Sequence, residues 1–213
     1  MNILIAGAAG FIGTNLTLAL MKNPANHITI TDTDTSYFTN ETIIAANNVS
    51  CLALHTQTHN FENILENIDL VFHLVSTTNP SSSNNDIEAE LNENITFSTR
   101  LLEASVKHHV SKIIFISSGG TVYGNVACPI TENAPTNPIT AYGIQKLTIE
   151  KICHLYHCMH GIDYSILRLA NPYGPYQRPN GKLGALTTFT YKALHQETLH
   201  VYGDGSVVRD YIY

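Results

Sequence analysis

A glycine-rich turn near the amino terminus constrains the fold of this chain more than any other feature of its sequence. The apolar run Asn2–Ala6 is typical of a buried strand, and it leads directly into Gly7-Ala8-Ala9-Gly10-Phe11-Ile12-Gly13. Residues 11–22 then carry apolar side chains at helical spacing and are followed by Pro24. Because glycine permits a tight turn and close packing of a helix on a strand, the segment predicts a strand–turn–helix unit.

The remaining sequence alternates between strand and helix patterns. Further strands are predicted at 27–31, 49–54, 69–75, 112–116 and 164–169, and helices around 61–65, over 87–107 and over 141–160. The Ser/Asn-rich stretch 76–86 and the proline-containing stretch 129–138 are expected to be loops. Nearly all-apolar strands that alternate with helices indicate a parallel sheet covered on both faces. The predicted fold is therefore α/β, with a Rossmann-type doubly wound parallel sheet in residues 1–170.

Residues 171–213 have a different character. Asn171–Pro175 has turn chemistry, 183–195 is compatible with a helix, and 203–205 is a tight turn. The sequence ends abruptly inside an apparent strand at 209–213. We expect 171–213 to be the start of a second, substrate-binding region that is incomplete, as in a truncated chain.

Composition excludes several classes of protein. Among the 213 residues, 17 acidic side chains against 11 Lys and Arg give a formal net charge of −6, without the clustered cations that binding to nucleic acid requires. No apolar run approaches the roughly 20 residues that cross a bilayer, and no signal peptide is evident, so no membrane association is expected. The four cysteines form neither a disulfide scaffold nor a zinc motif, which favours a reducing, cytoplasmic setting.

The glycine-rich turn is also suited to binding phosphate groups. A helix N-terminus presents unpaired N–H groups and a positive dipole end. Such a turn alone is weak support, because any tight strand-to-helix connection selects glycine. Asp32 strengthens the interpretation, since it lies 19 residues after Gly13 at the end of the second strand, where a carboxylate can accept from both ribose hydroxyls. A 2′-phosphate would be repelled there, so the predicted cofactor is NAD and not NADP.

Tyr142 and Lys146 form the candidate catalytic pair. They are four residues apart on a predicted helix and therefore share one face. A phenol has a pKa of about 10, and a nearby ammonium together with an oxidised nicotinamide would lower that pKa enough for the phenol to act as a base. Tyr-x-x-x-Lys by itself is usually a solvated pair. Here the pair follows the fifth strand, at whose carboxyl end Ser117–Thr121 lies, and catalytic groups collect at such ends.

These motifs together resemble those of the extended short-chain dehydrogenase/reductase family, and most of all its nucleotide-sugar 4-epimerases. The matching segments are Gly7–Gly13, Asp32, Phe72–Leu74, Asn94, Ser117–Gly124, Tyr142–Lys146, Arg168–Pro175 and Gly203–Tyr213. They occur in the order and spacing of the family and cover essentially the whole chain.

The resemblance implies a UDP-hexose 4-epimerase. Tyr142 would remove a proton from a sugar hydroxyl while hydride passes from C4 to NAD, and hydride would return to the other face of the sugar. The residues implied in cofactor binding are Gly7, Gly10, Phe11, Ile12, Gly13, Asp32, Leu74, Asn94, Ser117, Tyr142 and Lys146. Asn171 and Arg209 would bind the nucleoside-diphosphate sugar. The helices at 87–107 and 141–160 would pair with their copies in a homodimer.

The sequence departs from the family pattern at two site positions. Gly119 stands where the family usually has a Ser or Thr that is hydrogen-bonded to the sugar hydroxyl. We expect the hydroxyl of Thr121 or Ser118 to take that role. Leu54 or His55 stands where an aspartate commonly reads adenine, so adenine recognition is expected to be weaker or to use the backbone.

Several alternatives remain open at this point. Relatives that are 4,6-dehydratases carry Asp-Glu immediately before the Val-Tyr-Gly motif, where this chain has Gly120-Thr121. A reductase or decarboxylase on the same fold is harder to exclude, and Gly119 also allows a catalytically compromised nucleotide-binding protein. The histidines and cysteines within 153–160 lack the spacing of a metal site, so no metal is predicted. His73 is expected to be a packing residue.

Overall fold

The computed structural model describes residues 1–54, 61–78, 83–179, 184–201 and 203–213. Its main sheet has six strands, all parallel, in the order β3-β2-β1-β4-β5-β6. The strands are β1 (Asn2–Ala6), β2 (His27–Asp32), β3 (Val49–Ala53), β4 (Leu70–His73), β5 (Lys112–Ser118) and β6 (Asp163–Leu169). The predicted Rossmann-type doubly wound parallel sheet is confirmed by this order.

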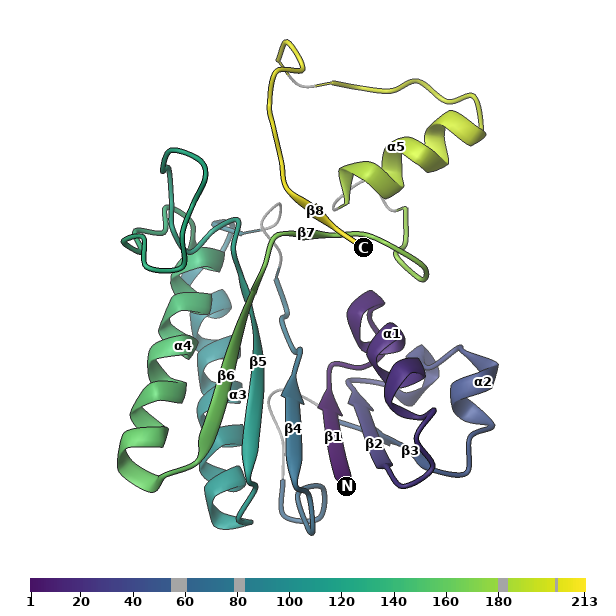
Figure 1. Ribbon diagram of the computed structural model, residues 1–213, viewed down its shortest axis with the longest axis vertical. Coiled ribbons are helices and arrows are strands. Elements are labelled where there is room, and N and C mark those ends of the chain that lie inside the picture. The colour runs from purple at the N-terminus through teal and green to yellow at the C-terminus, as the bar shows by residue number, and fades with distance from the viewer. Residues whose placement is uncertain (55–60, 79–82, 180–183, 202) are drawn as a thin grey trace.

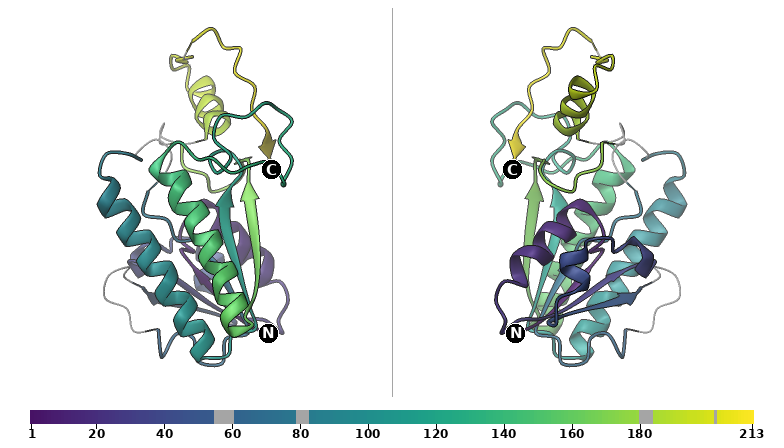
Figure 2. Two further views of the ribbon diagram at one scale, coloured as in Figure 1. Left: turned by 90° about the vertical axis from the view of Figure 1, so that its left-hand side faces the viewer. Right: turned by 90° about the vertical axis from the view of Figure 1, so that its right-hand side faces the viewer.

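Helices cover both faces of the sheet. The helices are α1 (Phe11–Leu20), α2 (Glu41–Ile44), α3 (Ile87–Lys107), α4 (Ala141–His160) and α5 (Ala185–Leu194). Helices α3 and α4 run side by side against β4, β5 and β6, whereas α1 and α2 lie beside β1, β2 and β3 (Figures 1 and 2). The layers thus follow from the crossover connections of parallel strands.

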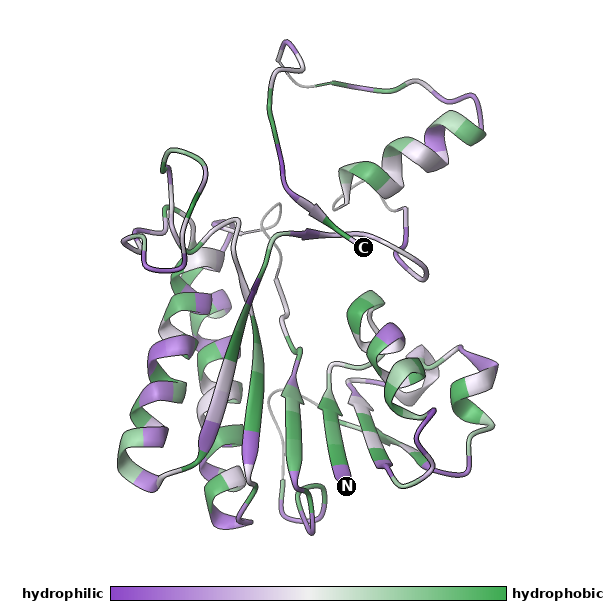
Figure 3. Cartoon of the chain, in the orientation of Figure 1, coloured by the Kyte–Doolittle hydropathy of each residue, from purple (hydrophilic) through white to green (hydrophobic). Residues whose placement is uncertain are grey.

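Strand β1 divides the core into two clusters. Ile3 and Ile5 pack with the side chains beneath α1, while Leu4 and Ala6 point the other way into the cluster beneath α3 and α4. This alternation is the period of two of a strand that is buried on both faces. Figure 3 shows the strands of the main sheet as largely hydrophobic. The same alternation in β5 sends Phe115 into the α3/α4 cluster.

Local boundaries differ from the predictions in a few places. The helix expected around 61–65 is a pair of turns, in which the amides of Ile64 and Leu65 both donate to the carbonyl of Phe61. The segment is too short to continue, and Asn67 follows it with a φ of +60°. A 3₁₀ helix at Thr35–Tyr37 and the short α2 were not predicted, because a single turn carries no periodic signal.

The final segment forms a separate small sheet. Strands β7 (Asn171–Pro172) and β8 (Tyr211–Ile212) pair in parallel, and α5 lies between them in the sequence. Figure 1 shows β7, β8 and α5 above the carboxyl ends of the main strands. The main sheet ends at Leu169, and the division into domains at residue 170 stays a prediction. Across the described residues, no helix has both the length and the apolar character needed to span a membrane.

Candidate active site

The glycine-rich turn leads from β1 into α1, and two of its glycines are required by close packing. Gly7 has a φ of +85°, and a Cβ atom there would lie 2.9 Å from the amide nitrogen of Val75. A Cβ atom at Gly13 would lie 2.5 Å from the Cα of Ala8. At Gly10, by contrast, the closest atom would be 3.9 Å away. Gly7 and Gly13 therefore shape the turn, and Gly10 leaves space above it.

The first turn of α1 is open to a ligand. Gly10 is its N-cap residue, and within the described part of the chain no side chain caps this helix. The amide groups of the first turn are thus available to an anion. The uncapped amides and the space above Gly10 fit the pyrophosphate of a dinucleotide.

The Asp32 carboxylate stands next to this turn at the end of β2. Its Oδ2 accepts from the amide of Ala9 at 3.0 Å, and its Oδ1 accepts from the amide of Thr33 at 2.9 Å. Two backbone donors therefore fix the orientation of the carboxylate. Asp32 is partly exposed and lines a cavity of about 810 Å³. A contact between Asp32 and ribose stays a prediction.

The cavity is bounded by three segments of the chain. The glycine turn and Asp32 form one wall, residues 37–43 form the second, and Tyr176, Gln177 and Arg178 form the third. Sequence reasoning identified the first wall and missed the other two. No periodic pattern marks residues 37–43, and residues 176–178 are brought over α1 by a tertiary contact in which Asn15 donates to the carbonyl of Pro175 at 2.8 Å.

Of the eleven residues predicted to bind the cofactor, Gly10, Phe11 and Asp32 line this cavity, and the other eight, Tyr142 and Lys146 among them, lie outside its lining. Leu74 packs against the cluster beneath α1, and its amide donates to the carbonyl of Ala6 at 2.9 Å. Of the two residues considered for the adenine-reading position, Leu54 is 3 % exposed, whereas His55 lies outside the described residues.

Asn94 fixes the loop that follows β4. This residue is 3 % exposed on α3, its Oδ1 accepts from the amide of Thr77 at 3.0 Å, and its Nδ2 donates to the hydroxyl of Thr77 at 2.8 Å. These bonds hold Thr77, which lies four residues after the end of β4, and the role of Asn94 at the cofactor stays a prediction. The fully buried His73, at the end of β4, packs between Phe97 and Phe115. Burial, reinforced by the charge of Lys146, lowers the pKa of His73 to about 3, so His73 is a neutral packing residue near neutral pH.

Tyr142 and Lys146 lie in the first two turns of α4, whose start is capped by three side chains. Thr140 accepts from the amide of Gly143, Asn84 from that of Ala141, and Ser83 from that of Tyr142, at 3.1, 2.8 and 2.8 Å. A Cβ atom at Gly143 would lie 2.8 Å from the carbonyl oxygen of Thr121, so α4 begins in direct contact with the turn after β5.

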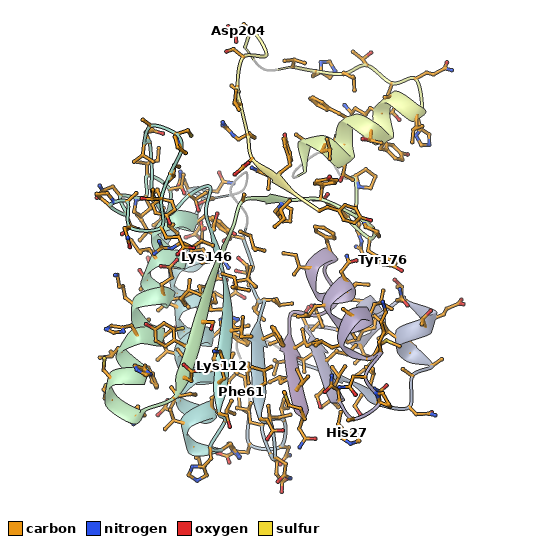
Figure 4. The ribbon with its side chains drawn as sticks, viewed as in Figure 1. His27, Phe61, Lys112, Lys146, Tyr176 and Asp204 are labelled. Atoms are coloured by element: carbon orange, nitrogen blue, oxygen red, sulfur yellow. The ribbon has the colours of Figure 1, made fainter. Side chains whose placement is uncertain are left out.

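The two side chains are close together, with Lys146 buried and Tyr142 half-buried. The Lys146 ammonium lies 5.7 Å from the centroid of the Tyr142 ring and 4.8 Å from that of Phe115. It donates to the carbonyl of Ile116 at 2.9 Å. Figure 4 places Lys146 and Tyr176 toward the same end of the sheet, and Lys112 and His27 toward the opposite end. The pair therefore lies toward the end of the sheet where the dinucleotide-type turn is found.

In the protein without NAD, the pKa values of both members of the pair are shifted. Burial lowers the pKa of Lys146 to about 8, and it raises the pKa of Tyr142 to about 12, with a further rise from the negative charge of Glu90. The ammonium one turn away does not outweigh these two effects. The lowered pKa predicted for the phenol includes the charge of an oxidised nicotinamide, so it stays a prediction for the NAD-bound protein.

The hydroxyl groups after β5 have distinct environments. The Thr121 Oγ1 is buried and has no hydrogen-bond partner among the described residues. Ser118 ends β5, and its carbonyl accepts from the amide of Val122 at 3.3 Å. The Ser117 hydroxyl donates to Glu150 at 2.5 Å, and its contact with the cofactor stays a prediction. At Gly119 a Cβ atom would lie 2.9 Å from the carbonyl oxygen of Arg168, so this turn has no room for the usual Ser or Thr.

The predicted substrate residues belong to the small sheet. Asn171 donates through its side chain to the carbonyl of Asp210 at 2.8 Å, which ties β7 to the strand that follows Arg209. Arg209 is exposed, and its guanidinium donates to the carbonyl of Val208 at 2.9 Å.

The His154 side chain of α4 bonds to its neighbours. Its ring is hydrogen-bonded to the Tyr164 hydroxyl, and its Nε2 lies 3.6 Å from the sulfur of Cys158. No group of three or more potential metal ligands occurs in the described ranges.

Comparison with known proteins agrees with this geometry. Residues 3–213 match the NAD dependent epimerase/dehydratase family. A putative UDP-glucose 4-epimerase of Methanocaldococcus jannaschii is 32 % identical, and the match covers 99 % of this chain and 69 % of that protein.

Solved structures of UDP-sugar 4-epimerases superimpose closely on this chain. The UDP-glucuronic acid 4-epimerase of Bacillus cereus, in complex with UDP-glucuronic acid and NAD, is 31 % identical with a TM-score of 0.90, and the match covers 100 % of this chain and 69 % of that one. The UDP-N-acetylglucosamine 4-epimerase of Methanobrevibacter ruminantium M1, in complex with UDP-N-acetylmuramic acid, is 29 % identical with a TM-score of 0.91, and the match covers 100 % and 68 %.

Proposed function

Because this chain belongs to the NAD dependent epimerase/dehydratase family, we propose that it is an NAD-dependent 4-epimerase of a UDP-hexose. One observation carries the proposal: the Tyr142 ring lies 5.7 Å from the Lys146 ammonium, and both follow the strand β5 of a doubly wound sheet. An ionisable phenol with a cation one helical turn away, at the carboxyl end of such a sheet, suits proton transfer beside a dinucleotide.

The adenosine and pyrophosphate parts of the cofactor would occupy the cavity above the glycine turn. The uncapped amides of α1 would bind the pyrophosphate, and Asp32, held by two backbone donors, would accept from the adenosine ribose. Tyr37 and Phe38 offer apolar surface near Asp32, which supports adenine recognition without a carboxylate. Bound NAD supplies the hydride acceptor and the positively charged ring.

Tyr142 would act as the base toward the C4 hydroxyl of the sugar. Lys146 would hold the nicotinamide ribose and stabilise the phenolate, because its ammonium lies on the same face of α4. Thr121 would hydrogen-bond the sugar hydroxyl, a role that its buried and unpartnered Oγ1 supports. Ser118 is the second candidate for that contact. Asn94 would keep the loop after β4 in place beside the cofactor.

The substrate side of the site would use the small sheet. Asn171 and Arg209 would contact the sugar and the diphosphate, and a guanidinium is well suited to a bidentate phosphate contact. The two similar solved structures contain UDP-sugars, which supports uridine as the nucleoside. We also infer a homodimer through the outer faces of α3 and α4, where Ile87, Leu155 and Met159 are about half exposed or more. The four free cysteines support a reducing, cytoplasmic setting.

A second candidate is a nucleotide-binding protein that does not turn over sugars. Gly119 favours it, because the hydroxyl that relatives place there is absent and the turn cannot accept a Cβ atom without a shift. A 4,6-dehydratase is disfavoured by Gly120-Thr121, since neither residue supplies the acid and base that elimination of water requires. A reductase would consume reduced cofactor, and a decarboxylase would release carbon dioxide from a UDP-uronate.

The test starts from the cofactor of the purified protein. The protein is denatured, the released nucleotide is identified, and native protein is incubated with a panel of UDP-hexoses and UDP-uronates. Formation of the 4-epimer without net NADH is expected. A 4-keto-6-deoxy product would assign a dehydratase instead, and bound NAD with no change in any sugar would assign the non-catalytic binding protein.

A further inference from the structure

A partly buried ion pair between α4 and β6 lies beside the turn that follows β5, and none of the roles given above uses it. The Arg168 guanidinium donates to Glu150 through Nη2 at 2.6 Å and through Nε at 3.0 Å. The Glu150 side chain is 6 % exposed and that of Arg168 is 23 % exposed. Such bidentate pairing holds both side chains in one geometry.

The pair is bonded to both ends of the turn. Before the turn, the Ser117 hydroxyl donates to Glu150 at 2.5 Å. After the turn, Arg168 Nη1 donates to the Tyr123 hydroxyl at 2.8 Å, and the guanidinium carbon lies 5.0 Å from the centroid of the Tyr123 ring. Residues 118–122, which include both candidate hydroxyls, are therefore held at each end by the same two charged side chains.

The pair also fixes the position of α4 along β5. Tyr142, Lys146 and Glu150 follow one another at intervals of four and share one face of the helix. Lys146 donates to the carbonyl of Ile116, and Glu150 accepts from the next residue, Ser117. Two successive turns of α4 are thus bonded to two successive residues of β5, so a shift of Glu150 would carry the catalytic pair with it.

The buried negative charge of Glu150 requires Arg168 as its partner. A buried carboxylate without a partner is strongly unfavourable, and Glu150 lies one helical turn from Lys146. Arg168 satisfies Glu150 and leaves the Lys146 ammonium to Ile116 and the cofactor. The backbone of β6 adds a further contact, since the amide of Gly119 donates to the carbonyl of Leu169 at 2.7 Å.

We propose that Glu150 and Arg168 are positioning residues, which act through Tyr123 and Ser117 to hold the 118–122 turn against the start of α4. The kinetic consequence rests on the proposed function, whereas the ordering of the turn does not. Neither residue is assigned to touch the substrate or the cofactor.

The test is Tyr123→Phe, which removes only the hydroxyl that Arg168 binds and keeps the buried ring. Amide hydrogen exchange in residues 118–122 is expected to rise about tenfold, the effect of losing one hydrogen bond to a charged group, with unchanged exchange in β5. On the sugar that the wild type converts, kcat is expected to fall about tenfold while KM and NAD affinity stay within about twofold. Arg168→Lys, which keeps the charge but not the fork, is expected to give a larger loss of the same kind.

The matched control is Asp163→Asn, which removes an exposed ion pair with Lys112 (3.0 Å) at the opposite end of β5 and β6. This variant is expected to leave exchange at 118–122 and kcat unchanged. Wild-type exchange in Tyr123→Phe would overturn the proposal. So would a loss of kcat that Asp163→Asn reproduces, because that would reflect general stability. If the wild type converts no sugar, the proposed function fails, and the exchange measurement still decides this inference.

Discussion

The Lys146 ammonium donates to the carbonyl oxygen of Ile116 at 2.9 Å, so a buried cation on α4 is bonded to the end of β5. This bond places the cation 5.7 Å from the ring of Tyr142. It also explains how a lysine that is 3 % exposed is tolerated, because a carbonyl oxygen replaces part of its lost hydration. The geometry exists before any ligand binds, and catalysis by positioning depends on such preorganisation.

Replacing Lys146 tests that arrangement. Lys146→Met keeps the volume of the side chain but removes the ammonium, and we expect kcat to fall at least about 100-fold, as for loss of a group that assists proton transfer. Lys151→Met, at an exposed position on the same helix, is the control and is expected to retain wild-type kcat. Equal activity in the two variants would contradict the role of Lys146.

Replacing Gly10 or Gly13 of the glycine-rich turn with alanine is expected to have different effects on stability and on NAD affinity. Gly13→Ala places a Cβ atom 2.5 Å from the Cα of Ala8 and should destabilise the protein by about 1–3 kcal/mol. Gly10→Ala has space and should leave the unfolding free energy within about 0.5 kcal/mol of the wild type. Its Cβ atom would point into the proposed pyrophosphate site, so NAD affinity should fall. Urea unfolding and NAD titration measure both effects; normal NAD binding by Gly10→Ala would place the dinucleotide elsewhere.

His73 makes stability depend on pH in acid. Its pKa is lowered by burial from 6.5 to about 3, so below pH 6.5 the unfolded chain takes up a proton that the folded chain excludes. Stability from this residue is therefore complete above pH 6.5 and is lost by about 1.4 kcal/mol per pH unit as the pH falls toward 3.

The measurement compares urea unfolding at pH 6 and pH 5. The wild type is expected to lose more stability between these values than His73→Asn, and the exposed His27→Asn should keep the wild-type dependence. The comparison uses the change with pH, so the loss of packing in His73→Asn does not obscure it. Parallel curves for all three proteins would show that His73 is not held neutral.

The ionisation of Tyr142 should respond to ligand and to Glu90. Burial and then the charge of Glu90 raise the pKa of Tyr142 to about 12, so the tyrosinate absorbance that Tyr142→Phe removes should not appear below about pH 11 in the free protein. Glu90→Gln should move this ionisation to lower pH, and NAD should move it further. An ionisation that NAD leaves in place would contradict the proposed activation of the phenol.

The sequence predicted those features that depend on local patterning. The apolar runs at Asn2–Ala6 and Lys112–Ile116 are strands, and the latter extends to Ser118. The helix that bears Tyr142 and Lys146 runs from Ala141 to His160, as its spacing indicated. The two strands are short continuous apolar runs, and the helix is a longer segment, so the length of each segment distinguishes a strand from a helix.

Features that depend on contacts distant in sequence were missed. The partner of Ser117 is Glu150, 33 residues away, and no spacing rule connects them. The pKa of Tyr142 could not be predicted, because Glu90 reaches it from another helix. Tyr176 and Arg178 line the cavity because the chain after Pro175 is held over α1 by the hydrogen bond from Asn15. Such relationships arise from tertiary packing and leave no periodic trace.

The most direct test of the central claim follows a deuterium atom. The UDP-sugar that the panel identifies is prepared with deuterium at C4 and converted by the wild type, and the product is analysed by NMR and mass spectrometry. We expect a 4-epimer that retains deuterium at C4, no net NADH, and no product from Tyr142→Phe despite normal NAD binding. Loss of the deuterium to water, or an equally active Tyr142→Phe, would contradict it.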